Sequence, residues 1–176
     1  MSTRRTLSVA ALLVAGALVA GCEQYDGNST TTVAVPPRET FAPVAALLES
    51  HCGTLDCHGS PARNLRIYGV NGLRANGNSV TGSPDTTEEE VDRTYESLVS
   101  VDPEHLGAVF AESGRDPERW LVIRKSRGTE LHTGGTPLPA GEPGDRCLTG
   151  WIAGGTDGGV CTEDDFGPKP RAGETW

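Results

Sequence analysis

Two cysteines and a histidine share one short segment, Cys52-Gly53-Thr54-Leu55-Asp56-Cys57-His58. A cysteine pair followed at once by histidine is the arrangement that attaches c-type haem, because the thiols form thioethers to the porphyrin and the imidazole binds the iron. The usual motif has two residues between the cysteines, whereas this one has four, so we expect the segment to bulge and Gly53 to supply the backbone freedom for the bulge. The segment predicts haem c as the cofactor, bound through Cys52 and Cys57, with His58 as the proximal iron ligand.

The opposite face of the haem is then either open or bound by a donor from elsewhere in the chain. The only methionine is Met1, at the start of an apolar N-terminal segment, so an axial methionine is excluded. His132 is the best distal candidate, because the neighbouring Gly134 and Gly135 let the backbone approach a cofactor closely.

The other two histidines have simpler interpretations. His105 follows Asp102-Pro103-Glu104 and is expected to be solvated. His51 directly precedes Cys52, which places it too close in sequence to reach the opposite face of a haem, and we expect it at a helix C-terminus.

The N-terminal residues have the features of a lipoprotein signal. Arg4 and Arg5 precede an apolar run that ends in Leu18-Val19-Ala20-Gly21-Cys22, which resembles a lipobox. We therefore expect residues 1–21 to be a signal peptide, Cys22 to be lipidated and residues 22–39 to form a flexible tether. The expected location is the cell envelope, with the chain held to the membrane by its lipid anchor and facing the periplasm or exterior.

The charge and the remaining cysteines fit an exported protein. The formal net charge is −9, which argues against nucleic acid as a partner. Apart from Cys22 the chain has four cysteines, an even number. We expect Cys147 and Cys161 to form a disulfide that fixes the C-terminal segment and contributes on the order of 3 kcal/mol.

Apolar spacing predicts a mainly α domain of three to four short helices joined by long Gly/Pro-rich loops. The expected helices cover 41–51, 88–100 with a Thr87–Glu90 capping box, a stretch opened by Asp116-Pro117 and ended by Gly128, and 145–153 with Asp145 as its N-cap. The domain is expected to span 40–156, followed by an irregular tail over 157–176. With 23 Gly, 12 Pro and only three each of Phe, Trp and Tyr, the chain has few core residues, and a haem would supply apolar surface for the loops to enclose.

This order of features resembles the class I, monohaem cytochrome c fold. The residues that carry the resemblance are a helix, the cysteine segment ending in His58-Gly59, glycine-rich loops, His132-Thr133-Gly134-Gly135 and a terminal Gly150-Trp151-Ile152 segment. The resemblance implies that the first and last helices cross beside the haem. The chain departs from the family pattern in the spacing of its cysteines and in having Leu138-Pro139 where many relatives have Met-Pro.

The sequence favours an exported, lipid-anchored protein that carries single electrons to and from redox proteins outside the cytoplasm, rather than an enzyme. One alternative is a binding or structural lipoprotein without haem, in which Cys52 and Cys57 form a disulfide. Another is a zinc site using Cys52, Cys57 and His58, although no fourth ligand is evident nearby. No motif of hydrolytic catalysis stands out.

Overall fold

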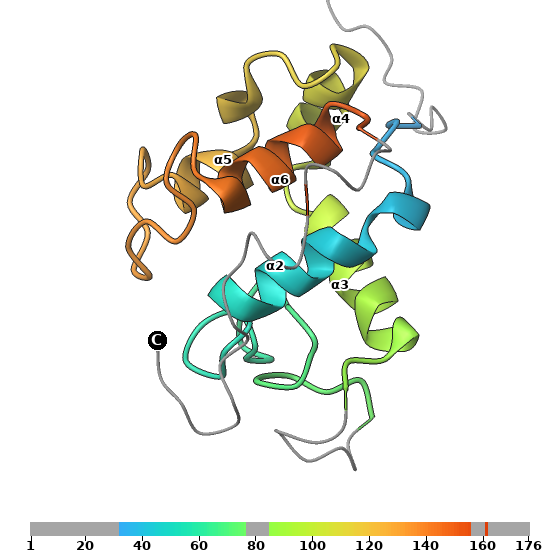
Figure 1. The fold of residues 1–176 in the computed structure, drawn as a ribbon, viewed down its shortest axis with the longest axis vertical. Helices are drawn as coiled ribbons and strands as arrows, with labels where there is room; N and C mark the ends of the chain where they lie inside the picture. The colour runs from blue at the N-terminus through green and yellow to red at the C-terminus, as the bar shows by residue number, and fades with distance from the viewer. Residues whose placement is uncertain (1–31, 77–84, 156–160, 162–176) are drawn as a thin grey trace, which may run out of the picture. The chain divides into compact units, whose positions relative to one another are not determined.

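Five α-helices and two short 3-10 helices build the part of the chain that the structure describes (Figure 1). The structure is a computed structural model, and it describes residues 32–76, 85–155 and 161. Within these residues there is no β-strand, only an isolated bridge between Tyr68 and Leu73. The predicted mainly α fold is therefore confirmed.

The first long helix, α2, spans Ala42–Cys52 and follows the 3-10 turn η1 at Arg38–Thr40. Pro43 lies in its first turn, where a missing N–H costs nothing. Phe41, Val44 and Leu47 are fully buried, so one face of the helix belongs to the core. The helix ends at Cys52, the first residue of the cysteine segment.

The predicted capping box is present at the start of α3, which spans Glu88–Val99. The Thr87 side chain accepts a hydrogen bond from the Glu90 amide, and the Glu90 carboxylate accepts one from the Thr87 amide. Pro36, before η1, and Arg38, its first residue, both contact this helix: the Tyr95 hydroxyl donates to the Pro36 carbonyl at 2.8 Å, and Arg38 pairs with Asp92 at 2.6 Å. Ordered contacts with the domain thus begin within the segment expected to be a tether.

The region between α3 and α6 differs from the sequence expectation. Helix α4 at Pro103–Ala111 was not expected, and the stretch after Asp116 is divided into the 3-10 turn η2, Pro117–Arg119, and helix α5, Leu121–Ser126. Trp120 has an extended backbone, with a ψ of 129°, and separates the two. Its indole is fully buried and donates to the Val101 carbonyl at 2.7 Å, so tertiary packing interrupts the helix there.

The last helix, α6, spans Pro143–Ile152 and packs against both α2 and α4. Its N-cap is Glu142, so the prediction that Asp145 caps this helix was wrong. Asp145 is instead buried inside the first turn, where its carboxylate accepts hydrogen bonds from Arg127 at 2.7 and 3.0 Å and from the Gly141 amide at 2.8 Å. The ion pair attaches the end of α5 to the start of α6.

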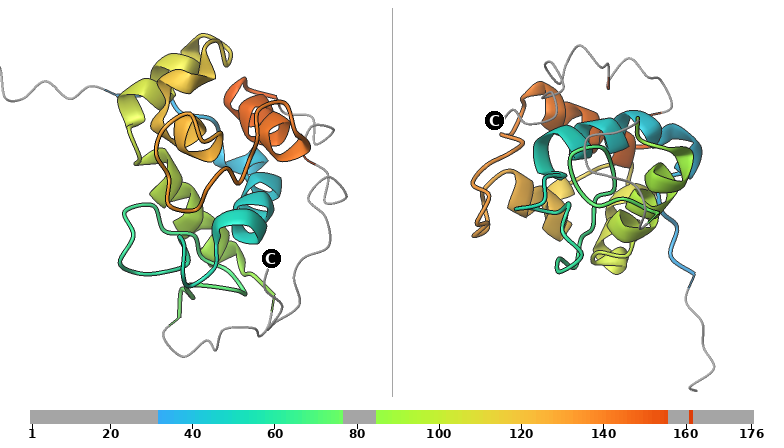
Figure 2. Two further views of the ribbon diagram at one scale, coloured as in Figure 1. Left: turned by 90° about the vertical axis from the view of Figure 1, so that its left-hand side faces the viewer. Right: turned by 90° about the horizontal axis from the view of Figure 1, so that it is seen from below.

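Helices α2 and α6 lie next to one another (Figures 1 and 2). Phe41, directly before α2, contacts Trp151 in α6, and their ring centroids are 5.1 Å apart. Two long segments are connected to this pair of helices: one follows α2, and the other joins α5 to α6. In the left view of Figure 2, the segment between α5 and α6 descends toward the segment that follows α2. The candidate site lies between these segments.

Candidate functional site

The cysteine segment closes on itself through backbone hydrogen bonds. The His58 amide donates to the Cys52 carbonyl at 2.9 Å. The Thr54 carbonyl accepts from the amides of Cys57 and Gly59, each at 2.9 Å. The four residues between the cysteines therefore form a compact turn that brings His58 back to the end of α2.

Three glycines allow this turn to pack against its neighbours. A side chain on Gly59 or on Gly72 would overlap the Gly53 carbonyl oxygen, and a Cβ on Gly53 would lie 2.7 Å from the Glu49 carbonyl oxygen. The expected reason for Gly53 was wrong, because its φ of −84° is open to any residue. Glycine is required at these positions because the backbones approach one another closely.

His58 is half-buried, and a backbone carbonyl fixes its ring. Its Nδ1 lies 3.0 Å from the Leu65 carbonyl oxygen, a contact that favours the tautomer with the proton on Nδ1. Burial lowers the pKa of His58 and electrostatic interactions with His132 and Arg63 lower it further, although the Leu65 hydrogen bond acts in the opposite direction. A lowered pKa favours the neutral imidazole, the form that binds a metal.

His132 lies in the loop between α5 and α6, and its ring has a similar hydrogen bond. Its Nδ1 is 3.2 Å from the Gly135 carbonyl oxygen, across a turn in which Gly135 has a φ of +72°. The loop is joined to the domain on both sides of this turn: Lys125 Nζ donates to the Leu131 carbonyl, and the Leu138 amide donates to the Ser126 carbonyl at 3.0 Å. The buried Leu138 side chain fixes the far end of the loop.

The two histidines, separated by 74 positions in sequence, lie together in space. Their ring centroids are 6.0 Å apart and their planes differ by only 13°. In each ring Nδ1 contacts a backbone carbonyl, which leaves Nε2 as the nitrogen with an available lone pair. The structure thus provides two neighbouring imidazoles with the same orienting interaction.

Two cavities meet at this histidine pair. The larger, which we call the apolar cavity, has a volume of about 330 Å³, and hydrophobic side chains dominate its lining, among them Leu48, Leu65, Val122, Leu138 and Leu148. The smaller, which we call the cysteine-side cavity, has a volume of about 210 Å³ and includes His51, Asp56 and Cys57. Both are lined by Cys52, His58, Arg63, His132, Thr133 and Pro137.

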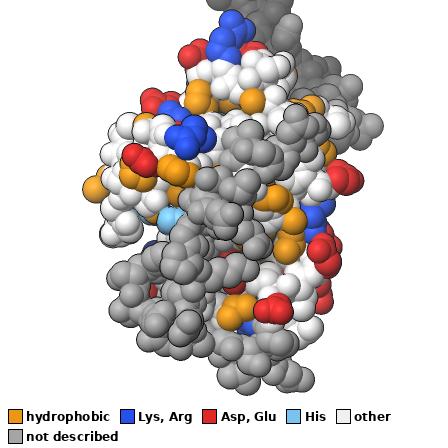
Figure 3. All heavy atoms as spheres, in the orientation of Figure 1, with side chains coloured by type: hydrophobic (Ala, Val, Ile, Leu, Met, Phe, Trp, Pro, Cys, Tyr) orange, Lys and Arg blue, Asp and Glu red, His pale blue; other side chains and the backbone are white. Residues whose placement is uncertain are grey.

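The site reaches the surface through its two loops. Leu131, beside His132, is 91% exposed although it lines the apolar cavity, and Leu55, between the two cysteines, is 53% exposed. On the face drawn in Figure 3 a histidine side chain reaches the surface with hydrophobic side chains close to it. A group held between the loops would have one edge near solvent.

Cys52 and Cys57 are not bonded to one another in this structure. Burial raises the pKa of the Cys52 thiol to about 12, and the proximity of Cys57 adds to the rise. A thiol of this kind is a poor nucleophile by itself, so any modification of Cys52 requires an activated reaction partner.

The described residues contain no group of three or more His, Cys, Asp or Glu side chains arranged to hold a metal ion. In this part of the chain the geometry therefore lends no support to the zinc-site alternative.

The other two histidines are not part of the pair. His105 is exposed on α4, where its Nδ1 contacts Asp102 at 2.7 Å, and it lines neither cavity. His51 lies in the last turn of α2 and lines the cysteine-side cavity, and burial lowers its pKa.

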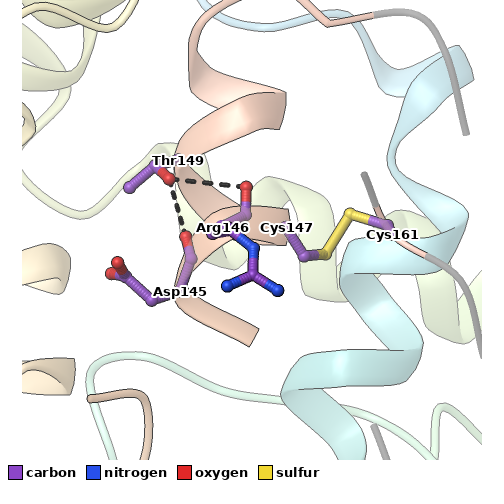
Figure 4. Close-up of a disulfide and its surroundings, with 5 residues drawn as sticks. All are labelled: Asp145, Arg146, Cys147, Thr149 and Cys161. Carbon is purple, nitrogen blue, oxygen red and sulfur yellow. Dashed lines mark hydrogen bonds between the residues drawn. A yellow bond between two sulfur atoms is a disulfide. The ribbon is translucent and has the colours of Figure 1, made fainter. Parts of the chain in front are cut away.

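The predicted disulfide is present between Cys147 in α6 and Cys161, with their Cα atoms 4.7 Å apart (Figure 4). Cys147 is fully buried, and Figure 4 shows its side chain pointing away from Asp145 and toward Cys161. The bridge therefore attaches the chain beyond α6 to the core.

Sequence reasoning did not find three contributors to the site. The Leu65 carbonyl orients His58, Arg63 lines both cavities, and Gly72 packs against the cysteine segment. Glycine punctuation around Gly72 was visible in the sequence, but no sequence signal marks which carbonyl or which arginine will face the histidine.

Comparisons with protein-family models, curated proteins and solved structures found no match to this chain. None of the helices in the described part of the chain is long and apolar enough to cross a membrane. The expected signal peptide, Cys22 and most of the expected C-terminal tail lie outside the described residues.

Proposed function

We propose that this protein is an exported, lipid-anchored c-type haem protein that carries single electrons, with Cys52 and Cys57 as the attachment sites and His58 and His132 as the axial iron ligands. The observation that carries the proposal is the pair of nearly parallel imidazoles beside two free cysteines.

The placement of the rings supports a shared role for the two histidines. Their centroids are 6.0 Å apart and their planes differ by 13°, so two metal-binding side chains from distant parts of the chain lie together. Both Nδ1 atoms contact backbone carbonyls, and a metal-binding histidine commonly makes such a contact because it fixes the orientation and the tautomer of the ring.

The surroundings of the histidines also suit a haem. The apolar cavity offers Leu48, Val122 and Leu148 to a flat hydrophobic group, and Cys52 lies on the wall of both cavities. When bound, haem supplies the reversible one-electron change at iron. The chain would bind it, exclude water from most of it and leave an edge near solvent for exchange of electrons with a partner.

Axial ligation by two histidines has a functional consequence. Methionine as the sixth ligand raises the reduction potential, and this chain has no methionine except Met1. We therefore expect a potential below that of His/Met cytochromes. The proposed partners are redox proteins outside the cytoplasm, reached from a membrane anchor at Cys22 in the cell envelope.

The test is production of the full chain, with its N-terminal segment, in a bacterium that attaches c-type haem. We expect a Soret band, a split α/β region on reduction and a mass increase of one haem. Replacing both Cys52 and Cys57 by serine should abolish covalent attachment of haem. The control change His105→Ala, at a histidine that lines neither cavity, should leave the attachment intact.

The same experiment distinguishes the alternative. A purified chain without a Soret band, whose mass indicates that Cys52 and Cys57 have lost two hydrogens, would be a disulfide-stabilised binding or structural lipoprotein. That result would refute the haem proposal.

A further inference from the structure

Arg63 makes a two-pronged contact with the widened cysteine segment. Its Nη2 donates to the Asp56 carbonyl at 3.1 Å, and its Nε donates to the Cys57 carbonyl at 3.2 Å. The backbone of Arg63 is itself held in a turn, where its amide donates to the Ser60 carbonyl at 3.2 Å. Although Arg63 is exposed, its guanidinium therefore bridges two consecutive carbonyls.

These two carbonyls belong to the residues that lead into His58. The backbone hydrogen bonds of the turn join the amides of Cys57, His58 and Gly59 to carbonyls at its beginning. Arg63 instead binds carbonyls at the end of the turn, next to the second attachment site and the proximal histidine. The end of the turn is thus held from two sides, by its own amides and by the Arg63 side chain.

We propose that Arg63 is the positioning residue of the Cys-x4-Cys-His segment, and that its guanidinium fork keeps Cys57 and His58 in register despite the two extra residues. The proposal rests on the proposed function only in its consequence for haem attachment. Arginine suits this role because its planar fork presents two donors at once, which lysine does not do.

The position of Arg63 agrees with this role. Its side chain lines both the apolar cavity and the cysteine-side cavity, together with Cys52, His58 and His132. Loss of the fork would leave the backbone hydrogen bonds alone to hold Cys57 and His58, so both residues would gain freedom to move relative to Cys52. Because both thiols have to meet the same porphyrin, such movement should reduce attachment at Cys57 more than at Cys52.

The first experiment measures amide hydrogen exchange of the full chain as purified, for the wild type, Arg63→Gln, Arg63→Lys and Arg115→Gln. Arg115 is an exposed arginine that lines neither cavity, so its substitution controls for the loss of one positive charge. In both Arg63 variants we expect exchange at Cys57, His58 and Gly59 to be faster by about tenfold, a ratio that corresponds to about 1.4 kcal/mol. In Arg115→Gln it should be unchanged.

Three outcomes would overturn the proposal. Wild-type exchange rates in Arg63→Gln would show that the fork does not hold the segment. Wild-type exchange rates in Arg63→Lys, together with faster exchange in Arg63→Gln, would show that the positive charge suffices without the fork. Faster exchange throughout the chain would show a general structural role.

The second experiment maps thioethers by peptide mass spectrometry in the same variants. We expect a lower fraction of Cys57 attachment in both Arg63 variants and a wild-type fraction in Arg115→Gln; equal attachment at Cys57 in all variants would overturn the inference. If the wild type carries no haem, the proposed function fails, and the exchange data still decide whether Arg63 positions the segment.

Discussion

A buried ion pair joins the loop after the cysteine segment to α3, and it allows a quantitative prediction. Glu90 and Arg74 are 1% and 9% exposed, and the Arg74 guanidinium donates to the Glu90 carboxylate at 2.7 and 3.1 Å. The same carboxylate accepts hydrogen bonds from the amides of Ala75 and Thr87. One side chain thus connects the loop that contains Leu65 to the start of α3.

The perturbation is Glu90→Gln, which keeps the shape of the side chain and removes its charge. Breaking a buried ion pair from one side costs about 3–5 kcal/mol. We take the lower value, about 3 kcal/mol, because Arg74 keeps a hydrogen bond to the Asp85 carbonyl. In a domain of this size that cost lowers Tm by about 10 °C.

The matched control is Glu89→Gln, the same chemical change at the preceding residue. Glu89 pairs with Arg93 one turn later on the exposed face of α3, with both side chains more than 40% exposed. Exposed pairs of this kind contribute little to stability, because water and salt screen them. We therefore expect no measurable change in Tm.

The assay is urea unfolding of both variants at pH 7 and at about pH 3. Burial pushes the pKa of Glu90 upward, but hydrogen bonds from Thr87, Ala75 and Arg74 outweigh it and hold the pKa below its usual value. The carboxylate therefore contributes stability above the ordinary glutamate pKa of about 4.3, and this contribution is lost as the pH falls through the lower folded pKa. The difference between wild type and Glu90→Gln should shrink at the lower pH.

Equal free energies of unfolding for Glu89→Gln and Glu90→Gln at pH 7 would refute this reasoning. So would a difference between wild type and Glu90→Gln that stays constant between the two pH values, since the stabilisation would then not come from the charge of Glu90.

Three further changes test the site and its support. If the chain carries haem as proposed, His132→Ala should convert a low-spin spectrum to a high-spin one and let the reduced protein bind carbon monoxide; an unchanged spectrum would rule out His132 as a ligand. Gly59→Ala should lower the free energy of unfolding by about 1–3 kcal/mol, because the new methyl group meets the Gly53 carbonyl, and a urea unfolding curve like that of the wild type would contradict the close packing of the two backbones. Replacing both Cys147 and Cys161 by serine should lower the free energy of unfolding by about 3 kcal/mol relative to the wild type, measured under non-reducing conditions. An equal free energy of unfolding in the two proteins would show that the bridge does not stabilise the domain.

Local sequence signals were enough for the helices that depend on local interactions. The Thr87–Glu90 capping box predicts the start of α3, and the apolar spacing around Val44 and Leu48 predicts α2. Both signals involve residues within a turn or two of one another. For that reason they hold without knowledge of the rest of the chain.

The signals failed where distant contacts compete with local preference. Asp145 has the residue type of an N-cap, but its ion pair with Arg127 places it inside α6. Trp120 could continue a helix from Pro117, but its buried indole is fixed by the Val101 carbonyl and the helix is interrupted. Each outcome depends on a partner 18 or 19 positions away in the sequence.

For this chain the sequence alone determined the donor set: two cysteines and a histidine in one segment, no methionine outside the N-terminal apolar segment, and His132 beside two glycines. Only the tertiary structure decided that His132 lies 6.0 Å from His58, that each ring contacts a carbonyl, and that Arg63 holds the end of the widened turn. Residue types and their spacing fix which groups can react, because these are properties of a short stretch of chain. Which groups meet depends on how loops joined to different helices pack together, and no local pattern specifies that packing.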